Sequence, residues 1–231
     1  MPSGKLILVA TPIGNLGDLS PRASEALREA DIWIVEDTRV SGKLQGIVQT
    51  SKPMRVMNEH TAPFKVDSYV KEIWGGANAV VITDGGAPGI SDPGAILCDL
   101  CHQSGIEVDA IPGPSAVVTA LMLSGFFAQR FAFLGFLGRK PGDIRSELKA
   151  FAESPLTLVL FESPNRIERL IEVAGETLGS RRYALCRELT KMHQQVYRSV
   201  LPLAPSEGEV PRKGEVTLVI EGRRKKMELD S

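Results

Sequence analysis

Three loops rich in glycine and proline are the segments of this sequence best suited to bind a small molecule. They span residues 11–15, 84–94 and 112–115, and each follows a short apolar run. Glycine lets a ligand approach the backbone closely, and proline stiffens a loop so that less entropy is lost on binding. One such loop alone is more often an ordinary turn, but three loops that all follow apolar runs favour a binding site.

The spacing within these loops excludes the common nucleotide-binding motifs. Gly85, Gly86 and Gly89 lack the spacing of the Rossmann dinucleotide fingerprint. Pro88 and Pro93 suit a wide loop, not a turn that opens directly into a helix. No glycine run is followed by the Gly-Lys-Ser/Thr of a P-loop.

Cys98 and Cys101 precede His102 in the pattern of a c-type haem attachment site, but the segment is predicted to form a helix that ends at Gly105. Residues three apart share a helix face, so we interpret the two cysteines as buried thiols. They supply too few ligands for zinc, and no metal is expected. Three cysteines in 231 residues fit a reducing compartment better than a disulfide framework.

Apolar runs and helix-start signals define the elements that position the loops. Strands are predicted at residues 6–10, 32–35, 79–83 and 107–111. Ser20 and Pro21 are typical of a helix start, with serine as the N-cap and proline in the first turn. Continuous apolar strands that alternate with helices indicate a parallel sheet, which binds ligands at the carboxyl ends of its strands.

In the second half of the chain the pattern changes. Strands are predicted at residues 131–135, 156–161, 183–187, 195–200 and 215–221, with fewer helices between them and the last two strands paired antiparallel. Ser163 and Pro164 repeat the signal for a helix start. We therefore predict an α/β fold with two α/β domains, residues 1–115 and 116–222, followed by a flexible basic tail at residues 223–231.

Composition limits the functions open to the chain. Its 27 Lys and Arg and 28 Asp and Glu give a formal net charge of −1, whereas a binder of naked nucleic acid is usually strongly basic. Any RNA contact must therefore come from local basic clusters, each of which alone is more often a solvated surface. Four clusters are present: Arg139-Lys140, Arg181-Arg182, Arg212-Lys213 and residues 223–226. No segment is long and apolar enough to span a bilayer, and no signal-peptide pattern is present, so we expect a cytoplasmic protein.

The loops and several other segments resemble those of the tetrapyrrole-methylase superfamily. The matching segments run in order along most of the chain: residues 11–16, 36–39, 84–94, 112–116, 135–140, 161–166, 187–191 and 212–215. The Thr-Pro-Ile-Gly-Asn and Glu-Asp-Thr-Arg segments are similar to the branch that methylates small-subunit ribosomal RNA, and they differ from the porphyrin-modifying enzymes.

The resemblance implies an enzyme that transfers a methyl group from S-adenosylmethionine to the ribose 2′-oxygen of a cytidine in the decoding region of 16S rRNA, within the small ribosomal subunit. It also implies a homodimer, in which each chain has two α/β domains with the cofactor in the cleft between them. The cofactor-binding residues that it implies are Pro12, Gly85, Gly86, Ala87, Ile90, Ser115 and Ala116, with Glu162 and Leu189 from the second domain.

Two positions depart from the family pattern. The middle loop is usually Asp-Ala-Gly-Thr-Pro, whereas this chain has Ala87 in place of the threonine, which removes a hydroxyl that could bond the cofactor. The family also tends to show His-Asn-Glu where this chain has His60-Thr61-Ala62, which argues against a catalytic role for that segment.

Methyl transfer to a hydroxyl needs placement first and a proton acceptor second. A sulfonium methyl is already activated, so the main task is to hold the oxygen in line with it, and a general base then helps the weak nucleophile. Asp37 is the candidate base, with Arg39 placed to bind a phosphate or to orient the carboxylate. The alternative is that the two residues form a helix cap and an ion pair. Lys191 is a second candidate base, because a desolvated lysine can accept a proton.

Two other functions stay open. A methyltransferase of the same fold could act on a tetrapyrrole or a diphthamide precursor, but the Thr-Pro-Ile-Gly-Asn loop argues against it. A ribosome-associated RNA-binding module could have lost the cofactor, but the intact Ser-Asp-Pro-Gly and Pro-Gly-Pro-Ser loops argue against that.

Overall fold

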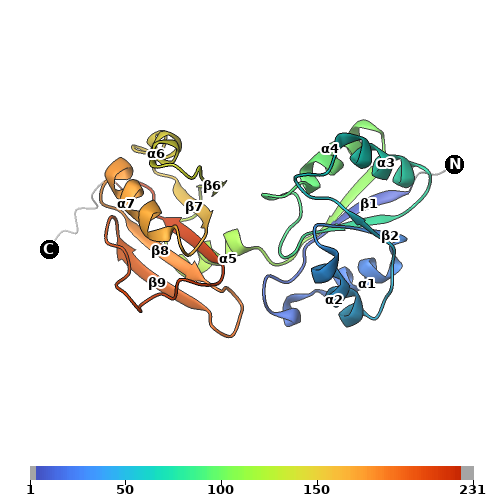
Figure 1. Cartoon of the computed structure of the whole chain (residues 1–231), viewed down its shortest axis with the longest axis horizontal. Coiled ribbons are helices and arrows are strands. Elements are labelled where there is room, and N and C mark those ends of the chain that lie inside the picture. Colours follow the sequence, from blue (N-terminus) through green and yellow to red (C-terminus); the bar gives the residue numbers. More distant parts are fainter. Residues whose placement is uncertain (1–3, 225–231) are drawn as a thin grey trace. The chain divides into compact units, whose positions relative to one another are not determined.

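The computed structural model describes residues 4–224. The chain divides into two compact units, Met1–Ser115 and Ala116–Ser231, each built around a five-stranded sheet (Figure 1). Within the described residues, no helix combines the length and the apolar character that a membrane span requires.

The sheet of the first unit, unit 1, is entirely parallel. Its strands are β1 (Lys5–Val9), β2 (Ile32–Val35), β3 (Met54–Val56), β4 (Ala79–Ile82) and β5 (Glu107–Ile111), in the spatial order β3-β2-β4-β1-β5. The connections hold η1 (Leu16–Asp18), α1 (Pro21–Glu29), α2 (Thr38–Val48), α3 (Pro63–Trp74) and α4 (Gly94–Gln103). Every residue of β2 and β4 is apolar and buried, as is typical of strands covered on both faces.

Alternate side chains of β2 enter two different cores. Trp33 and Val35 pack with α1 and α2, and the indole N–H of Trp33 donates a hydrogen bond of 2.9 Å to the backbone oxygen of Leu27. Ile32 and Ile34 pack with α3 and α4 on the opposite face. The two-residue period of the buried strand thus assigns one pair of helices to each face of the sheet.

Two local predictions for unit 1 can be compared with the structure. The hydroxyl of Ser20 accepts a hydrogen bond of 3.1 Å from the backbone N–H of Ala23, so Ser20 caps α1 as predicted. Cys98 and Cys101 both lie in α4, where Cys101 is buried and Cys98 is half-buried. In the described part of the chain, no group of three or more potential ligands is placed to hold a metal ion.

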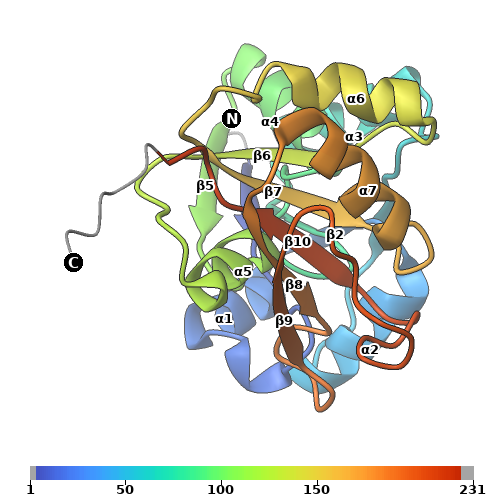
Figure 2. The same ribbon diagram turned by 90° about the vertical axis from the view of Figure 1, so that its left-hand side faces the viewer.

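The sheet of the second unit, unit 2, is mixed. Its strands are β6 (Phe131–Phe136), β7 (Thr157–Glu162), β8 (Arg182–Arg187), β9 (Gln195–Val200) and β10 (Val216–Ile220), in the order β6-β7-β10-β8-β9. β6 and β7 are parallel, and the other neighbouring strands are antiparallel. α6 (Pro141–Lys149) and α7 (Ile167–Leu178) cover one face around Leu158, Leu160 and Leu218 (Figure 2). α5 (Ala116–Ser124) packs on the other face, where the thiol of Cys186 lies 3.9 Å from the backbone oxygen of Ala120.

Two expectations for this half of the chain are wrong. β9 and β10 do not pair with each other, because β8 lies between them and pairs antiparallel with both. Residues 163–164 do not begin a helix, since they lie in a turn and α7 begins at Ile167. Of the predicted tail, Arg223 is held by a hydrogen bond of 2.8 Å from its backbone N–H to the oxygen of Ser154, and residues 225–231 lie outside the described residues.

Candidate functional site

Three loops of unit 1 meet at one edge of its sheet. Because all five strands are parallel, their carboxyl ends lie at the same edge, and the loops after β1, β4 and β5 leave from it. Thr11 and Gly86 exchange two backbone hydrogen bonds of 3.0 Å, which join the first loop to the second. The N–H of Ala10 donates to the oxygen of Ile111 at 3.1 Å, so the chain is paired immediately before the first and third loops begin. The three glycine- and proline-rich segments are therefore neighbours in space.

Glycine is required where these loops cross. A Cβ at Gly85 would lie 3.2 Å from the backbone oxygen of Pro12, and one at Gly113 would lie 3.0 Å from the Cβ of Ala10. Gly86 has a φ of +97°, a conformation that strains any residue with a side chain. Larger residues at these three positions would push the loops apart, so the close packing of the loops depends on glycine.

Asp92 fixes the rest of the loop after β4. Its carboxylate accepts three backbone hydrogen bonds, from Gly89 at 2.9 Å, from Ile90 at 3.1 Å and from Gly94 at 2.8 Å. The side chain of Ile90 is thereby held outside the core and is 51% exposed. An apolar side chain presented by a fixed loop is suited to contact a bound small molecule.

Asp37 and Arg39 form a helix cap and an ion pair. Asp37 is the N-cap of α2: its carboxylate accepts hydrogen bonds from the backbone N–H of Arg39 at 2.7 Å and from its guanidinium at 2.6 Å. The side-chain bond, followed by the backbone bond, lowers the pKa of Asp37 to about 2. A carboxylate with so low a pKa is a weak proton acceptor, and the contacts match the alternative of a cap and an ion pair. The catalytic role of the two residues stays a prediction.

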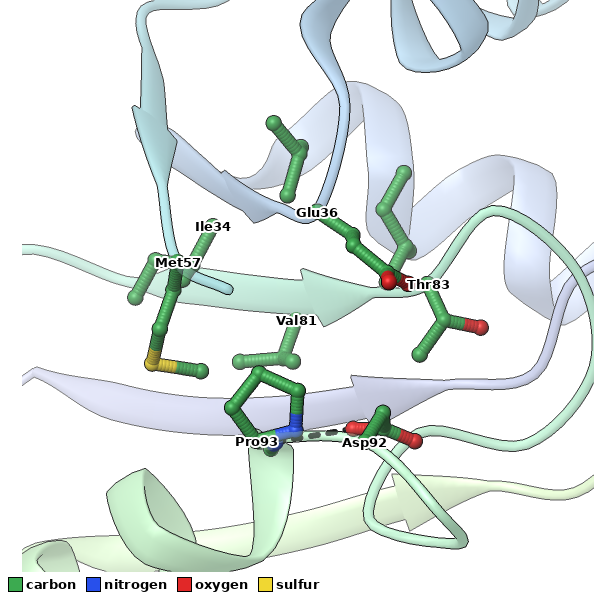
Figure 3. Close-up of a pocket in the computed structure, with 10 residues that line it drawn as sticks. Ile34, Glu36, Met57, Val81, Thr83, Asp92 and Pro93 are labelled. Atoms are coloured by element: carbon green, nitrogen blue, oxygen red, sulfur yellow. Dashed lines mark hydrogen bonds between the residues drawn. The ribbon is translucent and has the colours of Figure 1, made fainter. Parts of the chain in front are cut away.

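Glu36 and Asp84 are carboxyl groups with raised pKa values at the same edge. Burial raises the pKa of Glu36 most, followed by the charge of Asp84. Burial likewise raises the pKa of Asp84 most, followed by the charge of Asp37. Figure 3 shows that Glu36 lines a small pocket with Thr83 and Asp92, at the ends of β2 and β4. Sequence reasoning missed Glu36, although its position directly after a buried strand is the signal that could have found it.

Comparison with known proteins places the chain in a family. Residues 5–204 match the family of tetrapyrrole (corrin/porphyrin) methylases. The chain belongs to this family. Over 221 residues, this methylase is 38% identical to ribosomal RNA small subunit methyltransferase I of Thermotoga maritima, and the match covers 95% of this chain and 99% of that protein. It is 41% identical over 234 residues to the Mycobacterium bovis protein of the same name, with coverage of 100% and 82%.

A solved structure shares the fold. Uroporphyrin-III C-methyl transferase from Thermus thermophilus, complexed with S-adenyl homocysteine, is similar with a TM-score of 0.66 and 18% identity, over 94% of this chain and 97% of that one. The expected fold class, a tetrapyrrole-methylase fold with two α/β sheets, is confirmed.

In unit 2 of this methylase, Glu162 and Leu189 are fixed by local contacts. The side chain of Glu162 is 1% exposed and pairs with Arg166 at 3.2 Å. Its carboxylate also accepts a hydrogen bond of 2.7 Å from the next backbone N–H. Leu189 lies between two left-handed residues, Glu188 with φ 51° and Thr190 with φ 64°. The contribution of both residues to a cofactor site stays a prediction.

Lys191 is held between two carboxylates. Its Nζ lies 2.9 Å from Glu188 and 3.2 Å from Glu215. Burial lowers the pKa of Lys191, but the hydrogen bonds and charges of the two carboxylates outweigh burial and raise it. Gly214, with a φ of +91°, leaves room for this arrangement, since a Cβ there would lie 2.6 Å from the Glu188 carboxylate. A lysine with a raised pKa is protonated at neutral pH, which makes Lys191 a poor proton acceptor, and its catalytic role stays a prediction.

Most of the basic clusters are buried or paired with carboxylates. Arg182 and Arg224 pair with Glu221, Arg212 with Glu168 and Arg223 with Glu153. The buried Arg181 donates to backbone oxygens after α6 and at the end of α7. Lys225 and Lys226 lie outside the described residues. Arg139 and Lys140 are exposed, and none of the ion pairs in residues 4–224 involves them. Among the described residues, this pair is therefore the cluster in which both charges are available to a partner.

Proposed function

We propose that this chain is an enzyme that transfers a methyl group from S-adenosylmethionine to RNA of the small ribosomal subunit. The observation that carries the proposal is the 38% identity to a small-subunit rRNA methyltransferase over 95% of this chain and 99% of that protein. Membership of a methylase family supports it. So does the related fold that is complexed with S-adenyl homocysteine, the compound left when S-adenosylmethionine has lost its methyl group.

The crossing of the three loops fits such a cofactor. Glycine at Gly85 and Gly86 lets the loop after β4 pack closely against Pro12 and Ile13, so small residues form the crossing where the adenosine group is proposed to bind. At the same crossing, the hydroxyl of Thr11 is buried and has no hydrogen-bond partner within the described residues, so a polar atom is available there. The residues proposed to bind the cofactor are Pro12, Gly85, Gly86, Ala87, Ile90, Ser115 and Ala116, together with Glu162 and Leu189.

The proposed acceptor is the ribose 2′-oxygen of a cytidine in the decoding region, and this oxygen must lose a proton. Bound S-adenosylmethionine supplies a methyl group on a positively charged sulfur. Glu36 is better suited than Asp37 to take the proton, because burial raises the pKa of Glu36 whereas the bonds from Arg39 lower that of Asp37. Asp37, with a pKa of about 2, instead orients Arg39, whose 88% exposed side chain is proposed to bind an RNA phosphate. Lys191 stays protonated and serves the structure of unit 2.

Methyl transfer from radiolabelled S-adenosylmethionine tests the proposal. The acceptors are unmodified small ribosomal subunits, free 16S rRNA and a uroporphyrin, and label is expected in the RNA. Digestion to nucleosides followed by mass spectrometry is expected to show 2′-O-methylcytidine, whereas a base-methylated nucleoside would overturn the ribose assignment. Label in the porphyrin, or in none of the acceptors, would overturn the function. We further propose that the enzyme is a cytoplasmic homodimer. Sedimentation equilibrium of the purified chain tests whether it forms the dimer.

A further inference from the structure

The edge strand β6 of unit 2 carries phenylalanines on one face. Phe131 and Phe133 are two residues apart and pair with alternate residues of β7, so they point to the same side of the sheet. The β7 residues between those partners, Leu158 and Leu160, point to the other side, into the core under α6 and α7. The phenylalanines therefore lie on the face opposite these two helices.

A β-bulge adds Phe136 to the same face. From Phe133 to Phe136 the strand β6 advances by three residues, while β7 advances by two, from Val159 to Phe161. Gly135, inside the bulge, has a φ of +61°, a conformation that favours glycine. Without the extra residue, Phe136 would point to the side of α6 and α7. Instead the ring of Phe161 lies 4.9 Å from that of Phe133 and 5.6 Å from that of Phe136, between centroids.

The rings along this edge are unusually exposed for phenylalanine. Phe131 is 43% exposed, Phe136 is 63% exposed, and Phe127, in the turn before β6, is 44% exposed. Phe127 adjoins β6 because its backbone oxygen accepts a hydrogen bond of 2.6 Å from the hydroxyl of Thr157, the partner of Phe131. We call Phe127, Phe131 and Phe136 the aromatic strip. Phenylalanine is usually buried, so an exposed row of rings marks a binding surface.

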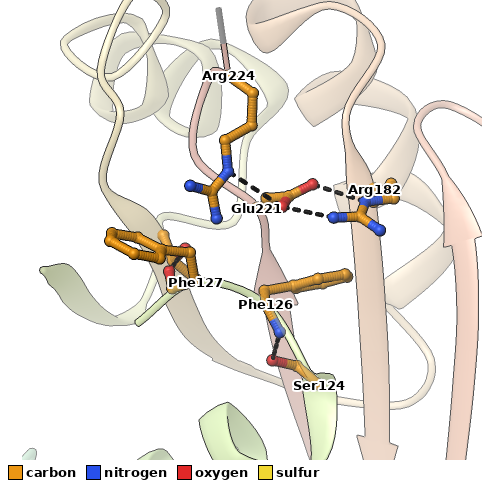
Figure 4. Close-up of polar contacts among 7 residues, drawn as sticks. Ser124, Phe126, Phe127, Arg182, Glu221 and Arg224 are labelled. Carbon is orange, nitrogen blue, oxygen red and sulfur yellow. Dashed lines mark hydrogen bonds and ion pairs between the residues drawn. The ribbon is translucent and has the colours of Figure 1, made fainter. Parts of the chain in front are cut away.

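Cations lie at both ends of the aromatic strip. The guanidinium carbon of Arg224 is 4.5 Å from the centroid of the Phe127 ring (Figure 4). Arg139 and Lys140 follow Phe136 by three and four residues in the sequence; both are exposed and take part in none of the ion pairs between described residues. The surface therefore combines flat apolar rings with positive charge.

We propose that the aromatic strip binds a single-stranded segment of the substrate RNA. Unpaired bases stack on exposed aromatic rings, and arginine and lysine next to the rings bind the backbone phosphates. Paired bases hide their faces in the helix stack, so a duplex is a poor partner for this surface. A second copy of the chain would gain little from the cations at the ends of the strip, so the charge favours an anionic partner. The inference rests on the proposed function, because it takes RNA as the substrate.

Substitution of Phe136 separates stacking from simple apolar contact. Phe136→Leu keeps an apolar side chain and removes the aromatic face, whereas Phe136→Trp keeps that face. Phe64→Leu is the matched control, since Phe64 is a 75% exposed ring on α3 of unit 1. With small ribosomal subunits as substrate, Phe136→Leu is expected to raise KM by about fivefold or more, with kcat unchanged within about twofold. Phe136→Trp and Phe64→Leu are expected to keep the wild-type KM.

A binding measurement gives a readout that is independent of catalysis. Fluorescence anisotropy compares a labelled single-stranded RNA oligonucleotide with the same sequence as a blunt duplex. The wild-type chain and Phe136→Trp are expected to bind the single strand more tightly than the duplex, and Phe136→Leu is expected to reduce this preference by about fivefold or more. Because Phe136 is mostly exposed, its variants are expected to unfold at the wild-type temperature.

The outcomes distinguish this inference from the proposed function. If the enzyme methylates rRNA and Phe136→Leu behaves like Phe64→Leu, the aromatic strip does not bind RNA and the proposed function stands. If the wild-type chain methylates no rRNA, the proposed function fails and the inference fails with it. If Phe136→Leu converts a dimer into a monomer during sedimentation, the strip binds a second copy and the RNA assignment is wrong.

Discussion

Replacing Glu36 by glutamine tests which of two adjacent carboxylates accepts the proton. Glu36→Gln keeps the shape of the side chain and removes the base, so kcat is expected to fall by about 100- to 10,000-fold, or about 3–5 kcal/mol of transition-state stabilisation. Affinity for S-adenosylmethionine is expected to stay unchanged. Asp37→Asn keeps the N-cap of α2, because asparagine caps helices as well as aspartate does, so a smaller loss of kcat and a raised KM for RNA are expected.

The two substitutions are also expected to change stability in opposite directions. Burial raises the folded-state pKa of Glu36 above 4.5, so its contribution to stability is present below that value and is lost as the pH rises through the raised pKa. At neutral pH, Glu36→Gln should therefore raise Tm. The pKa of Asp37 falls from 3.8 to about 2, so its contribution is present above 3.8 and is lost as the pH falls through about 2. Asp37→Asn should lower Tm at neutral pH and lose this effect in acid.

Single-turnover methylation across a pH series and thermal unfolding followed by circular dichroism measure these effects. The wild-type rate is expected to rise with pH as Glu36 loses its proton, and this rise should be absent in Glu36→Gln. A wild-type kcat in Glu36→Gln would refute the assignment. A larger loss in Asp37→Asn than in Glu36→Gln would make Asp37 the base, as the sequence alone predicted. A lower Tm in Glu36→Gln at neutral pH would refute the argument from burial.

Three further predictions concern the loops and the charges. Gly86→Ala places a side chain at a φ of +97°, a strain of about 1–2 kcal/mol, and is expected to weaken the binding of S-adenosylmethionine measured by calorimetry. The control is Gly46→Ala on α2, where a Cβ meets no other atom, and this variant is expected to stabilise the fold by about 0.5–1 kcal/mol and to leave binding unchanged. Equal affinities in the two variants would contradict the loop crossing as the cofactor site. Lys191→Met is expected to lower the free energy of unfolding, measured in urea, by about 1–2 kcal/mol and to reduce kcat by less than about tenfold. A loss of kcat of about 100-fold or more would instead make Lys191 the base. Arg139→Ala combined with Lys140→Ala is expected to reduce the salt slope of RNA binding by about two, and an unchanged slope would show that the pair is only a solvated surface.

β2 and β4 could be predicted because burial on both faces makes them continuous apolar runs. β1, β2, β4 and β5 lie within one residue of the predicted ranges. β3 escaped prediction, because its three residues are only half-buried and it is a strand through its pairing with β2. The order of strands in both sheets likewise depends on pairing between distant segments, which local sequence does not encode. That is why β8, unexpectedly, separates β9 from β10.

The candidate site also has features that could be predicted from local sequence and features that could not. The glycine loops could be predicted, since glycine and proline after an apolar strand indicate a loop from the local sequence alone. The raised pKa of Glu36 could not be predicted, because it depends first on burial in the folded chain and then on the charge of Asp84, which comes from the loop after a different strand. The charge of unit 2 was misjudged for the same reason: Arg182 and Arg224 belong to two separate basic clusters in the sequence, but in space they share the carboxylate of Glu221.

The carboxylates at the edge of the unit 1 sheet have different roles because their hydrogen-bond and ion-pair partners differ. Asp92 accepts three backbone hydrogen bonds and shapes a loop. Asp37 is hydrogen-bonded by Arg39 and caps a helix, and the same bonds that make it structurally useful stabilise its charged form and weaken it as a base. Glu36 has no cationic partner among the described residues, and burial disfavours its charge. A carboxylate whose charged form the fold stabilises least gains most by taking a proton, and this difference is the reason for proposing Glu36 and not Asp37 as the base.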